Sequence, residues 1–459
     1  MGTVGLSFGS ATSGQGFDVA TTVTQIQASE SAIETPWNTQ LTTLKAQDTV
    51  FTSLGSDLST LTTNLQALTD FDGVMSQMEG SSSNPDVLSL TSASTSAVAG
   101  SHTVTVTSLA STSSDYLNPI TNASDTLSGT LTFAVGSGSS TTITVDSSSN
   151  TLSTLAAAIN SAGAGVTASV ISDSTGSRLS LVSGTSGAAG QLNVTSTLSD
   201  ATEPSVDLTA INTGATGANA ALTVDGIQLT SASNTVSTAI PGVTFQLLAS
   251  NVGSPVQVEI TNNNTAVESA FSSLVTAYNA VVKDVTTQEG NDSSGNPEPL
   301  YGSPTLSLIQ SQLASAMNSG TASGSISNIA QLGLSFNDDG TLSLDTDTLD
   351  SALNSNFSDV TGFLQNTGSF GQNFETVLNN LGTQAPNGAV YLAQQQNSTE
   401  ETSLNTDITN ENATLATQKT TLTDELNTAN QILQSIPSQL NEVNEMYSAI
   451  TGYNSSQNG

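Results

Sequence analysis

The sequence lacks cysteine and is almost without basic residues. Its 459 residues contain no Cys, which excludes disulfide bonds, thiolate catalysis and cysteine-ligated metal centres. Only 4 Lys and Arg residues face 38 Asp and Glu residues, so the formal net charge is −34. Such scattered basic side chains cannot form a cationic patch, and we therefore expect no binding to nucleic acid.

Long hydrophobic runs are also missing. No apolar run approaches the roughly 20 residues of a membrane-spanning helix, so we expect no membrane insertion. Residues 1–17 have no basic start and no continuous apolar stretch, which predicts export without a cleaved signal peptide. The single histidine, His102, has no second His or Cys with which to form a metal site or a catalytic pair. From these absences we expect a protein that is not an enzyme and has no cofactor or bound metal.

Apolar residues recur at helical spacing near both ends of the chain. From Leu426 to Ile450 they follow alternating steps of three and four, the heptad pattern of a helix that packs on other helices, while Glu411 and Gln418 dilute an earlier run that begins at Leu404. A helix of that length cannot bury its stripe on itself, and we expect the N-terminal stripe to be its partner. This predicted seam consists of Trp37, Leu41, Leu44, Phe51, Leu54, Leu58, Leu61, Leu404, Ile408, Leu415, Leu422, Leu426, Leu433, Ile436, Leu440 and Val443.

Local signals predict where these helices begin and end. Asp18 is the expected N-cap of a thin helix within 17–34. Thr35 followed by Pro36 is typical of the start of a stronger helix that runs to about Asp70. Pro437 inside the C-terminal seam predicts a kink or a boundary. Because the seam has almost no Lys or Arg, we expect its contacts to be apolar and amide-based rather than salt bridges.

The middle of the chain alternates apolar and polar residues at β spacing. Short segments bounded by Gly, Asp, Asn or Ser predict antiparallel strands at 87–94, 102–110, 130–136, 141–146, 166–172, 178–184, 191–197, 221–231, 243–250 and 255–261. A helix is expected near 152–159, and 224–227 is typical of a tight hairpin. Helical periodicity returns at about residue 265 and is interrupted by a hairpin at 333–345.

This order predicts an α+β multidomain protein, in which both termini build a helical coiled-coil stalk with inserted antiparallel β-sandwich or barrel-like domains. The expected domains are flexible terminal leg helices at 1–36 and 437–459, a helical stalk at 37–84 and 263–436, a β domain at 85–120 and 205–262, and an outer β domain at 121–204.

Four stretches resemble the bacterial flagellar filament cap family, flagellar hook-associated protein 2 (FliD). Residues 5–32 are similar to its N-terminal export and assembly segment, 329–353 resemble its helical-domain hairpin, and the C-terminal seam ends in the family's usual place. Residues 218–250 resemble the short repeat shared by flagellins and hook-associated proteins. The core of this repeat motif is Asn234, Val236, Ile240, Pro241, Gly242 and Val243. No resemblance is found in 111–204.

The resemblance implies a structural protein at the distal, extracellular tip of the flagellum. Such a protein forms a homo-oligomeric ring, a pentamer, that promotes folding and insertion of exported flagellin and prevents its loss. The implied partners are other copies of the chain, flagellin, the hook–filament junction proteins and an export chaperone. Two alternatives stay open: another axial subunit, flagellin-like or junctional, and an extracellular adhesin that binds surface glycans through its β domains. The hairpin at 333–345 favours the cap.

Overall fold

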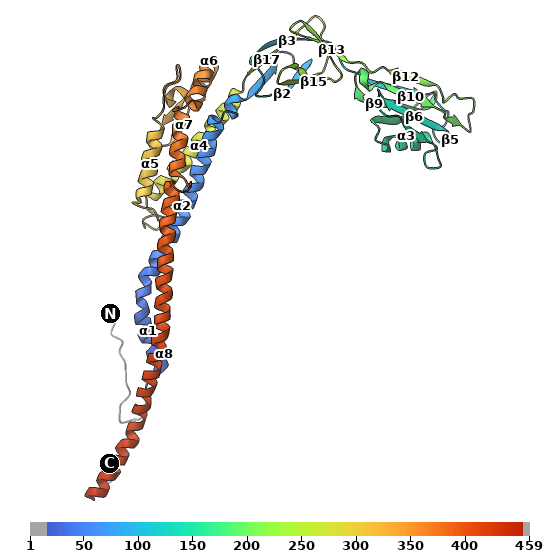
Figure 1. Cartoon of the computed structure of the whole chain (residues 1–459). Helices are drawn as coiled ribbons and strands as arrows, with labels where there is room; N and C mark the ends of the chain where they lie inside the picture. The colour runs from blue at the N-terminus through green and yellow to red at the C-terminus, as the bar shows by residue number, and fades with distance from the viewer. Residues whose placement is uncertain (1–15, 453–459) are drawn as a thin grey trace. The chain divides into compact units, whose positions relative to one another are not determined.

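The computed structural model describes residues 16–452 of the chain (Figure 1). The parts of the predicted terminal segments at 1–15 and 453–459 lie outside the described residues. The chain divides into two compact units, Met1–Ala67 with Ala270–Gly459 and Leu68–Ser269. Among the described helices, none is long and apolar enough to cross a membrane.

The first unit is built from helices and one small hairpin. Its elements are α1 (Val19–Glu30), the 3₁₀ turn η1 (Ser31–Ile33), α2 (Glu34–Thr69), α4 (Asn264–Gln288), α5 (Pro304–Ala316), η4 (Ile329–Leu332), β18 (Leu334–Phe336), β19 (Leu342–Leu344), α6 (Thr346–Gln365), α7 (Phe370–Leu381) and α8 (Ala389–Thr451). Figure 1 shows α2 and α8 lying side by side, with α4, α5 and α7 around the upper part of this pair.

The core of the helical unit lies among α2, α4, α5, α6 and α7. The leucine stripe of α2 is fully buried there, and Phe271 of α4 is buried with it. The rings of Phe363 and Phe370 stack with their centroids 5.3 Å apart, which joins α6 to α7. Helical spacing of these residues therefore explains both the helices and the face that each one buries.

Of the three local predictions for the helices, one is confirmed, one is wrong and one is excluded only in part. Asp18 is the N-cap of α1, and its carboxylate accepts the Thr21 N–H at 3.2 Å, as predicted. Thr35 is not a cap, because the 3₁₀ turn η1 leads without a break into α2 at Glu34. Pro437 does not form a boundary, since α8 continues through it, and the kink that was predicted as the alternative stays a prediction. A proline leaves one carbonyl of the preceding turn without its N–H, and water can bind that carbonyl on a surface helix.

The second unit is mainly antiparallel β structure. Its elements are η2 (Val74–Ser76), β1 (Met78–Ser82), β2 (Leu88–Ala93), β3 (Gly100–Ser108), β4 (Thr112–Leu117), β5 (Leu127–Ser128), β6 (Thr130–Val135), β7 (Thr141–Thr144), α3 (Leu152–Ser161), β8 (Val166–Asp173), β9 (Gly176–Ser186), η3 (Ala188–Gly190), β10 (Leu192–Ser196), β11 (Ser199–Asp200), β12 (Ile211–Ala215), β13 (Ala220–Val224), β14 (Ile227–Ser231), β15 (Thr235–Ile240), β16 (Val243–Leu247) and β17 (Val256–Asn262).

These strands enclose two separate hydrophobic cores. The sheets β1-β17-β3-β13-β14 and β15-β16-β2 surround the first core, in which Val104, Phe245 and Val258 are buried. The sheets β12-β4-β9-β8, β10-β6-β7 and β11-β5, together with α3, surround the second core around Phe133 and Leu155. The α+β fold class and each predicted strand segment are confirmed, whereas the four-part domain boundaries stay a prediction.

Candidate functional site

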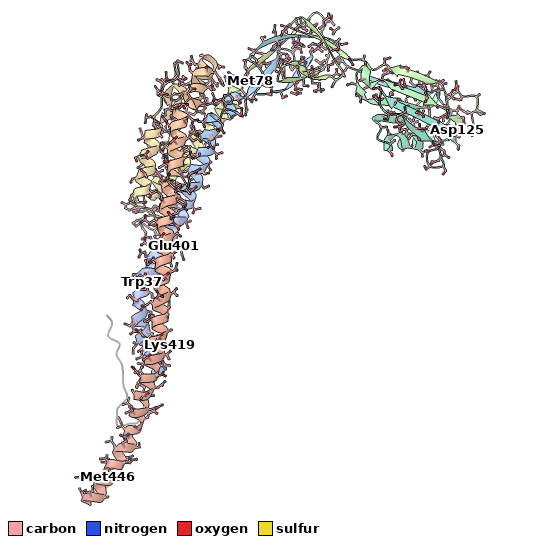
Figure 2. All side chains as sticks on the ribbon, in the orientation of Figure 1. Trp37, Met78, Asp125, Glu401, Lys419 and Met446 are labelled. Carbon is pink, nitrogen blue, oxygen red and sulfur yellow. The ribbon has the colours of Figure 1, made fainter. Side chains whose placement is uncertain are left out.

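The predicted seam between the two chain ends forms at one level of α2 and α8. Leu41 and Leu44 of α2 and Leu404 of α8 make a small buried cluster, and Trp37 and Ile408 pack against it. Figure 2 labels Trp37 at this level of the paired helices, close to Glu401. Residues more than 350 positions apart in the sequence therefore meet as the heptad pattern predicts.

Polar contacts along the seam join side-chain amides to carboxylate and hydroxyl oxygens. The Asn397 side-chain amide donates to Asp48 Oδ1 at 2.9 Å, and Gln394 Nε2 donates to Thr52 Oγ1 at 3.1 Å. Gln40 bonds Glu400 in the same way. No ion pair joins α2 to α8 in the described part of the chain. The contacts of this intramolecular pair are therefore apolar and amide-based, and the same expectation for contacts with another chain stays a prediction.

Helix α1 covers the next part of α8. Val23 of α1 and Leu415 of α8 are both buried. Gln27 Nε2 donates to the Leu415 carbonyl at 2.7 Å, and the Phe17 N–H donates to Asn430 Oδ1 at 2.9 Å. Helix α1 lies along α8, and Phe17 just before it extends the contact as far as Asn430.

The C-terminal part of the seam stays open. Leu422, Leu426, Leu433 and Ile436 are only partly buried. Leu440 is 43% exposed and Ile450 is 81% exposed, and Val443, Met446 and Tyr447 between them are exposed as well. Met446 stands near the free end of α8 (Figure 2). A periodic apolar stripe in water is typical of a surface that binds another chain. We call Leu440, Val443, Met446, Tyr447 and Ile450 the open stripe.

The remaining α2 residues of the predicted seam are core residues. Phe51, Leu54, Leu58 and Leu61 are buried within the helical unit. They stabilise the fold and are not accessible to a second chain.

The residues of the predicted repeat motif also stabilise the fold. Val236, Ile240 and Val243 belong to the first β core, and Pro241 lies exposed at the turn between β15 and β16. The Asn234 side chain both accepts from the Ala110 N–H at 2.7 Å and donates to the Ala110 carbonyl at 3.0 Å. Gly242 has φ of 74°, and a Cβ on it would lie 2.6 Å from the Ala97 nitrogen, so only glycine fits.

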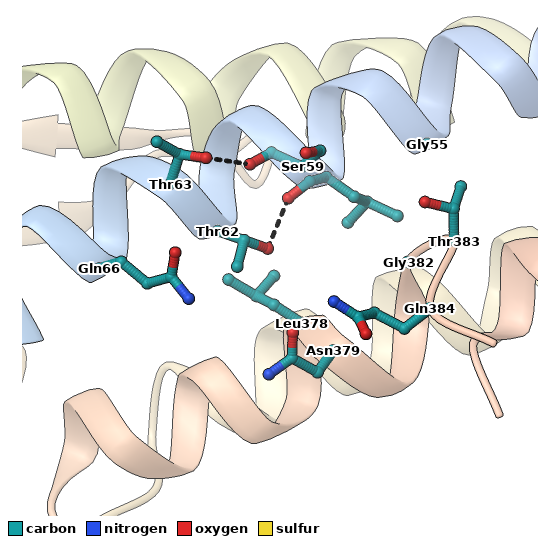
Figure 3. Close-up of a pocket in the computed structure, with 11 residues that line it drawn as sticks. Gly55, Ser59, Thr62, Thr63, Gln66, Leu378, Asn379, Gly382, Thr383 and Gln384 are labelled. Atoms are coloured by element: carbon teal, nitrogen blue, oxygen red, sulfur yellow. Dashed lines mark hydrogen bonds between the residues drawn. The ribbon is translucent and has the colours of Figure 1, made fainter. Parts of the chain in front are cut away.

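A pocket between α2 and α7 carries no recognisable chemistry. Its volume is about 170 Å³, and it is lined by amides, hydroxyls and leucines without an ionisable group (Figure 3). Thr62 and Thr63 donate their hydroxyl protons to backbone carbonyls of Leu58 and Ser59. A site with no acid, base or metal ligand offers no catalytic step.

Several carboxylates have displaced pKa values. The His102 ring and then the Thr103 N–H lower the pKa of Asp225, with His102 Nδ1 2.7 Å from Asp225 Oδ2. Asp225 thereby fixes the β13–β14 hairpin that was predicted at 224–227. Elsewhere in the β unit, carboxylate oxygens of Asp125, Asp200 and Glu203 lie within 4.8 Å of one another. Sequence spacing does not reveal this cluster, because Asp125 lies 75 or more residues before Asp200 and Glu203.

Comparisons with known proteins assign most of the chain. The family model "Flagellar hook-associated protein 2 C-terminus" matches residues 217–446, and "Flagellar hook-associated protein 2 N-terminus" matches 15–113. The B-type flagellar hook-associated protein 2 of Pseudomonas aeruginosa is 31% identical over 71% of this chain and 74% of its own length. Flagellar hook-associated protein 2 of Escherichia coli K12 is 27% identical over 76% of this chain and 78% of its own length.

A flagellin hook motif was missed in the sequence. The family model "Flagellin hook IN motif" matches residues 130–185, inside the span 111–204 where no resemblance was found. The matched residues form β6 to β9 of the second core. Apart from the alternation of apolar and polar residues that is typical of β strands, we found no motif in this part of the sequence. The repeat expected at 218–250 falls inside the C-terminal family match and stays a prediction.

A solved structure has the same architecture. The D1-D2-D3 domains of the flagellar cap protein FliD from Escherichia coli superpose with a TM-score of 0.58 at 26% identity, covering 76% of this chain and 99% of that one. Neither the adhesin nor the other axial subunit is favoured by these matches. They confirm the family predicted from sequence, and the chain belongs to the flagellar hook-associated protein 2 (FliD) family of flagellar cap proteins.

Proposed function

We propose that this protein caps the distal end of the flagellar filament as a ring of identical chains, a pentamer. Under this ring, exported flagellin folds and inserts instead of escaping. The observation that carries the proposal is the open stripe of α8. Helix α8 buries Leu404 against its own chain, but it leaves the apolar residues of the open stripe exposed to water. We infer that a second chain covers these exposed residues.

The ring and the filament supply the two partners that such a chain needs. Ring contacts join copies of this chain, and the open stripe contacts flagellin at the filament end. Apolar and amide contacts without ion pairs suit repeated release and rebinding, because few strong polar bonds must break. The hook–filament junction proteins and an export chaperone complete the proposed set of partners.

No enzymatic step belongs to this function. We propose export to the extracellular flagellar tip without a cleaved signal peptide. We also propose a surface glycan as an additional ligand of the β domains, and we assign no residue to it.

Electron microscopy tests the proposal. The purified full-length protein is imaged alone and mixed with sheared filaments of its own flagellin. Closed rings, with plugs at only one end of each filament, are expected, and their symmetry gives the number of copies. Matched samples carry Leu440→Ser with Val443→Ser, which should reduce filament plugging while the monomer stays folded.

Two outcomes would contradict the proposal. Long filaments formed by this protein itself would identify a flagellin-like subunit. A persistent monomer beside bare filament ends would leave the open stripe without a partner.

A further inference from the structure

The cluster of Asp125, Asp200 and Glu203 is built from two loops of the β unit. Asp125 lies in the loop before β5, Asp200 ends β11, and Glu203 lies in the loop that follows. Strands β5 and β11 pair, with Asp200 opposite Leu127, and the Ala201 N–H donates to the Thr126 carbonyl at 3.2 Å. Asp125 is labelled in Figure 2. Pairing of the strands therefore fixes the three carboxylates beside one another.

Asp200 distinguishes this cluster from the many exposed acids of the chain. It is only 1% exposed. Its Oδ1 accepts the N–H groups of Thr202 at 2.7 Å and Glu203 at 3.2 Å. Its Oδ2 is buried without a hydrogen-bond partner. A buried carboxylate oxygen without a partner costs free energy that a bound cation would recover.

No basic side chain of the described chain neutralises the cluster. The guanidinium of Arg178 bonds Asp173 at 2.6 Å, and His102 is paired with Asp225. Glu203 Oε2 accepts the Thr121 N–H at 3.0 Å, which holds this side chain between the two loops. The loops thus place three negative charges together and supply no protein cation.

We propose that Asp125, Asp200 and Glu203 bind one Ca²⁺ ion. Ca²⁺ takes oxygen ligands at about 2.4 Å, so two ligands on opposite sides of the ion lie about 4.8 Å apart. The separations in the cluster fit within that span. Carboxylate oxygens are hard ligands, and the absence of Cys or His among them disfavours Zn²⁺ and Cu²⁺. Mg²⁺ is disfavoured because it keeps most of its waters and demands near-ideal octahedral geometry.

Bound Ca²⁺ ties the loop before β5 to the loop after β11. Since β5 and β11 are two residues long each, they contribute few hydrogen bonds of their own. The ion therefore adds a cross-link at a weak point of the second core, and its removal loosens that core first.

Calcium binding is tested by isothermal titration calorimetry on the metal-free full-length protein. CaCl₂ and MgCl₂ are titrated in about 0.15 M NaCl, which screens diffuse binding of counter-ions to the acidic chain. We expect one Ca²⁺ per chain with a dissociation constant on the order of 10⁻⁴ M, within the range of extracellular calcium modules, and weaker binding of Mg²⁺. Thermal unfolding should show a higher Tm with Ca²⁺ than with an equal ionic strength of NaCl.

Variants separate the site from general charge effects. Asp125→Asn removes one ligand, and Glu203→Gln keeps an acceptor for the Thr121 N–H; both should lose Ca²⁺ binding and the Ca²⁺-dependent rise in Tm. Glu259→Gln, on the exposed face of β17, removes the same charge away from the cluster and should behave as the original protein. Equal Ca²⁺ binding by Asp125→Asn, or no Ca²⁺ effect beyond that of NaCl in the original protein, would overturn the proposal.

Discussion

Asp57 of α2 and Asp284 of α4 bring two carboxyl groups together within the helical unit. Burial raises the pKa of Asp57, and the hydrogen bond and charge of Asp284 raise it further. A carboxyl group with a raised folded pKa holds its proton more tightly in the folded protein than in the unfolded one. Its contribution to stability is therefore complete at low pH and is lost as the pH rises through the folded pKa.

Replacing Asp57 tests whether its carboxyl group destabilises the folded protein at neutral pH. Because the pair destabilises the fold at pH 7, we expect Asp57→Asn to raise Tm there by about 1–3 °C. The gain should disappear at pH values below the ordinary pKa of Asp, where the original carboxyl group is protonated too. Circular dichroism during heating at pH 7 and at pH 3 measures both. Glu289→Gln, exposed just after α4, is the control for net charge. A lower Tm of Asp57→Asn at pH 7 would contradict the argument.

Alanine substitutions at Gly242 and Gly253 distinguish the cost of a steric contact from the cost of backbone strain. Gly242 and Gly253 have φ values of 74° and 85°, so alanine is strained at both positions. A Cβ on Gly242 would also meet the Ala97 nitrogen at 2.6 Å, whereas a Cβ on Gly253 meets nothing within 4 Å. We expect Gly253→Ala to cost about 1 kcal/mol and Gly242→Ala at least about twice that. Urea unfolding of both variants gives the comparison, and equal losses would show that contact with Ala97 adds nothing.

At the scale of the element, apolar periodicity predicted the long helices and most of the strands. The heptads of α8 and the leucines of α2 predicted both helices, and the pairing was correct where Leu41 and Leu44 meet Leu404. The sequence could not show how far this cover extends, because exposed and buried heptad residues are the same amino acids. Contacts from the described residues before α1 reach Asn430, and the apolar positions of α8 are exposed from Leu440 onward.

Strand β4 was missed for a different reason. Its sequence is almost entirely polar, yet Ser113 and Asp115 are buried in it. Ser113 Oγ accepts the Leu192 N–H at 3.0 Å and bonds the Gln191 amide at 2.9 Å, so the partners that make burial possible come from a distant segment. The Asp125, Asp200 and Glu203 cluster was missed for the same reason. Alternation reveals apolar strands, whereas buried polar groups depend on tertiary contacts.

Substitutions at two leucines of α8 distinguish effects on folding from effects on assembly. Leu404 is 8% exposed in the seam cluster, and Leu440 is 43% exposed in the open stripe. We expect Leu404→Ala to lower the free energy of unfolding by about 2–3 kcal/mol, because it leaves a cavity against Leu41 and Leu44. Leu440→Ala should change the stability of the monomer by less than about 0.5 kcal/mol. Denaturant unfolding measures both.

The same two variants, Leu404→Ala and Leu440→Ala, also test assembly. Leu440→Ala should reduce the fraction of plugged filament ends under the microscope, whereas Leu404→Ala should plug ends normally at temperatures where it stays folded. Reduced stability of the Leu440→Ala monomer would show instead that the open stripe is part of the fold.

At the scale of the whole molecule, the net charge of −34 opposes self-association. A ring places several such chains together, and the seam offers no ion pairs by which one chain could offset the charge of another. The free energy gained by burying apolar surface in the ring must therefore exceed the electrostatic repulsion between the chains. Dissolved salt weakens this repulsion. The Debye length falls from about 30 Å at 0.01 M to about 8 Å at 0.15 M ionic strength.

Ring formation should consequently be promoted by salt. We expect sedimentation velocity to show mainly monomer at about 0.01 M NaCl and a growing ring fraction at about 0.15 M and above, because screening removes repulsion between chains while apolar contacts persist. Replacing NaCl by CaCl₂ at equal ionic strength, with Asp125→Asn in parallel, separates screening from a specific ion effect. Rings that dissociate as salt is added would require intermolecular ion pairs. The few basic side chains, Lys45, Arg178, Lys283 and Lys419, would then have to hold the ring together, and their replacement by Gln would abolish it.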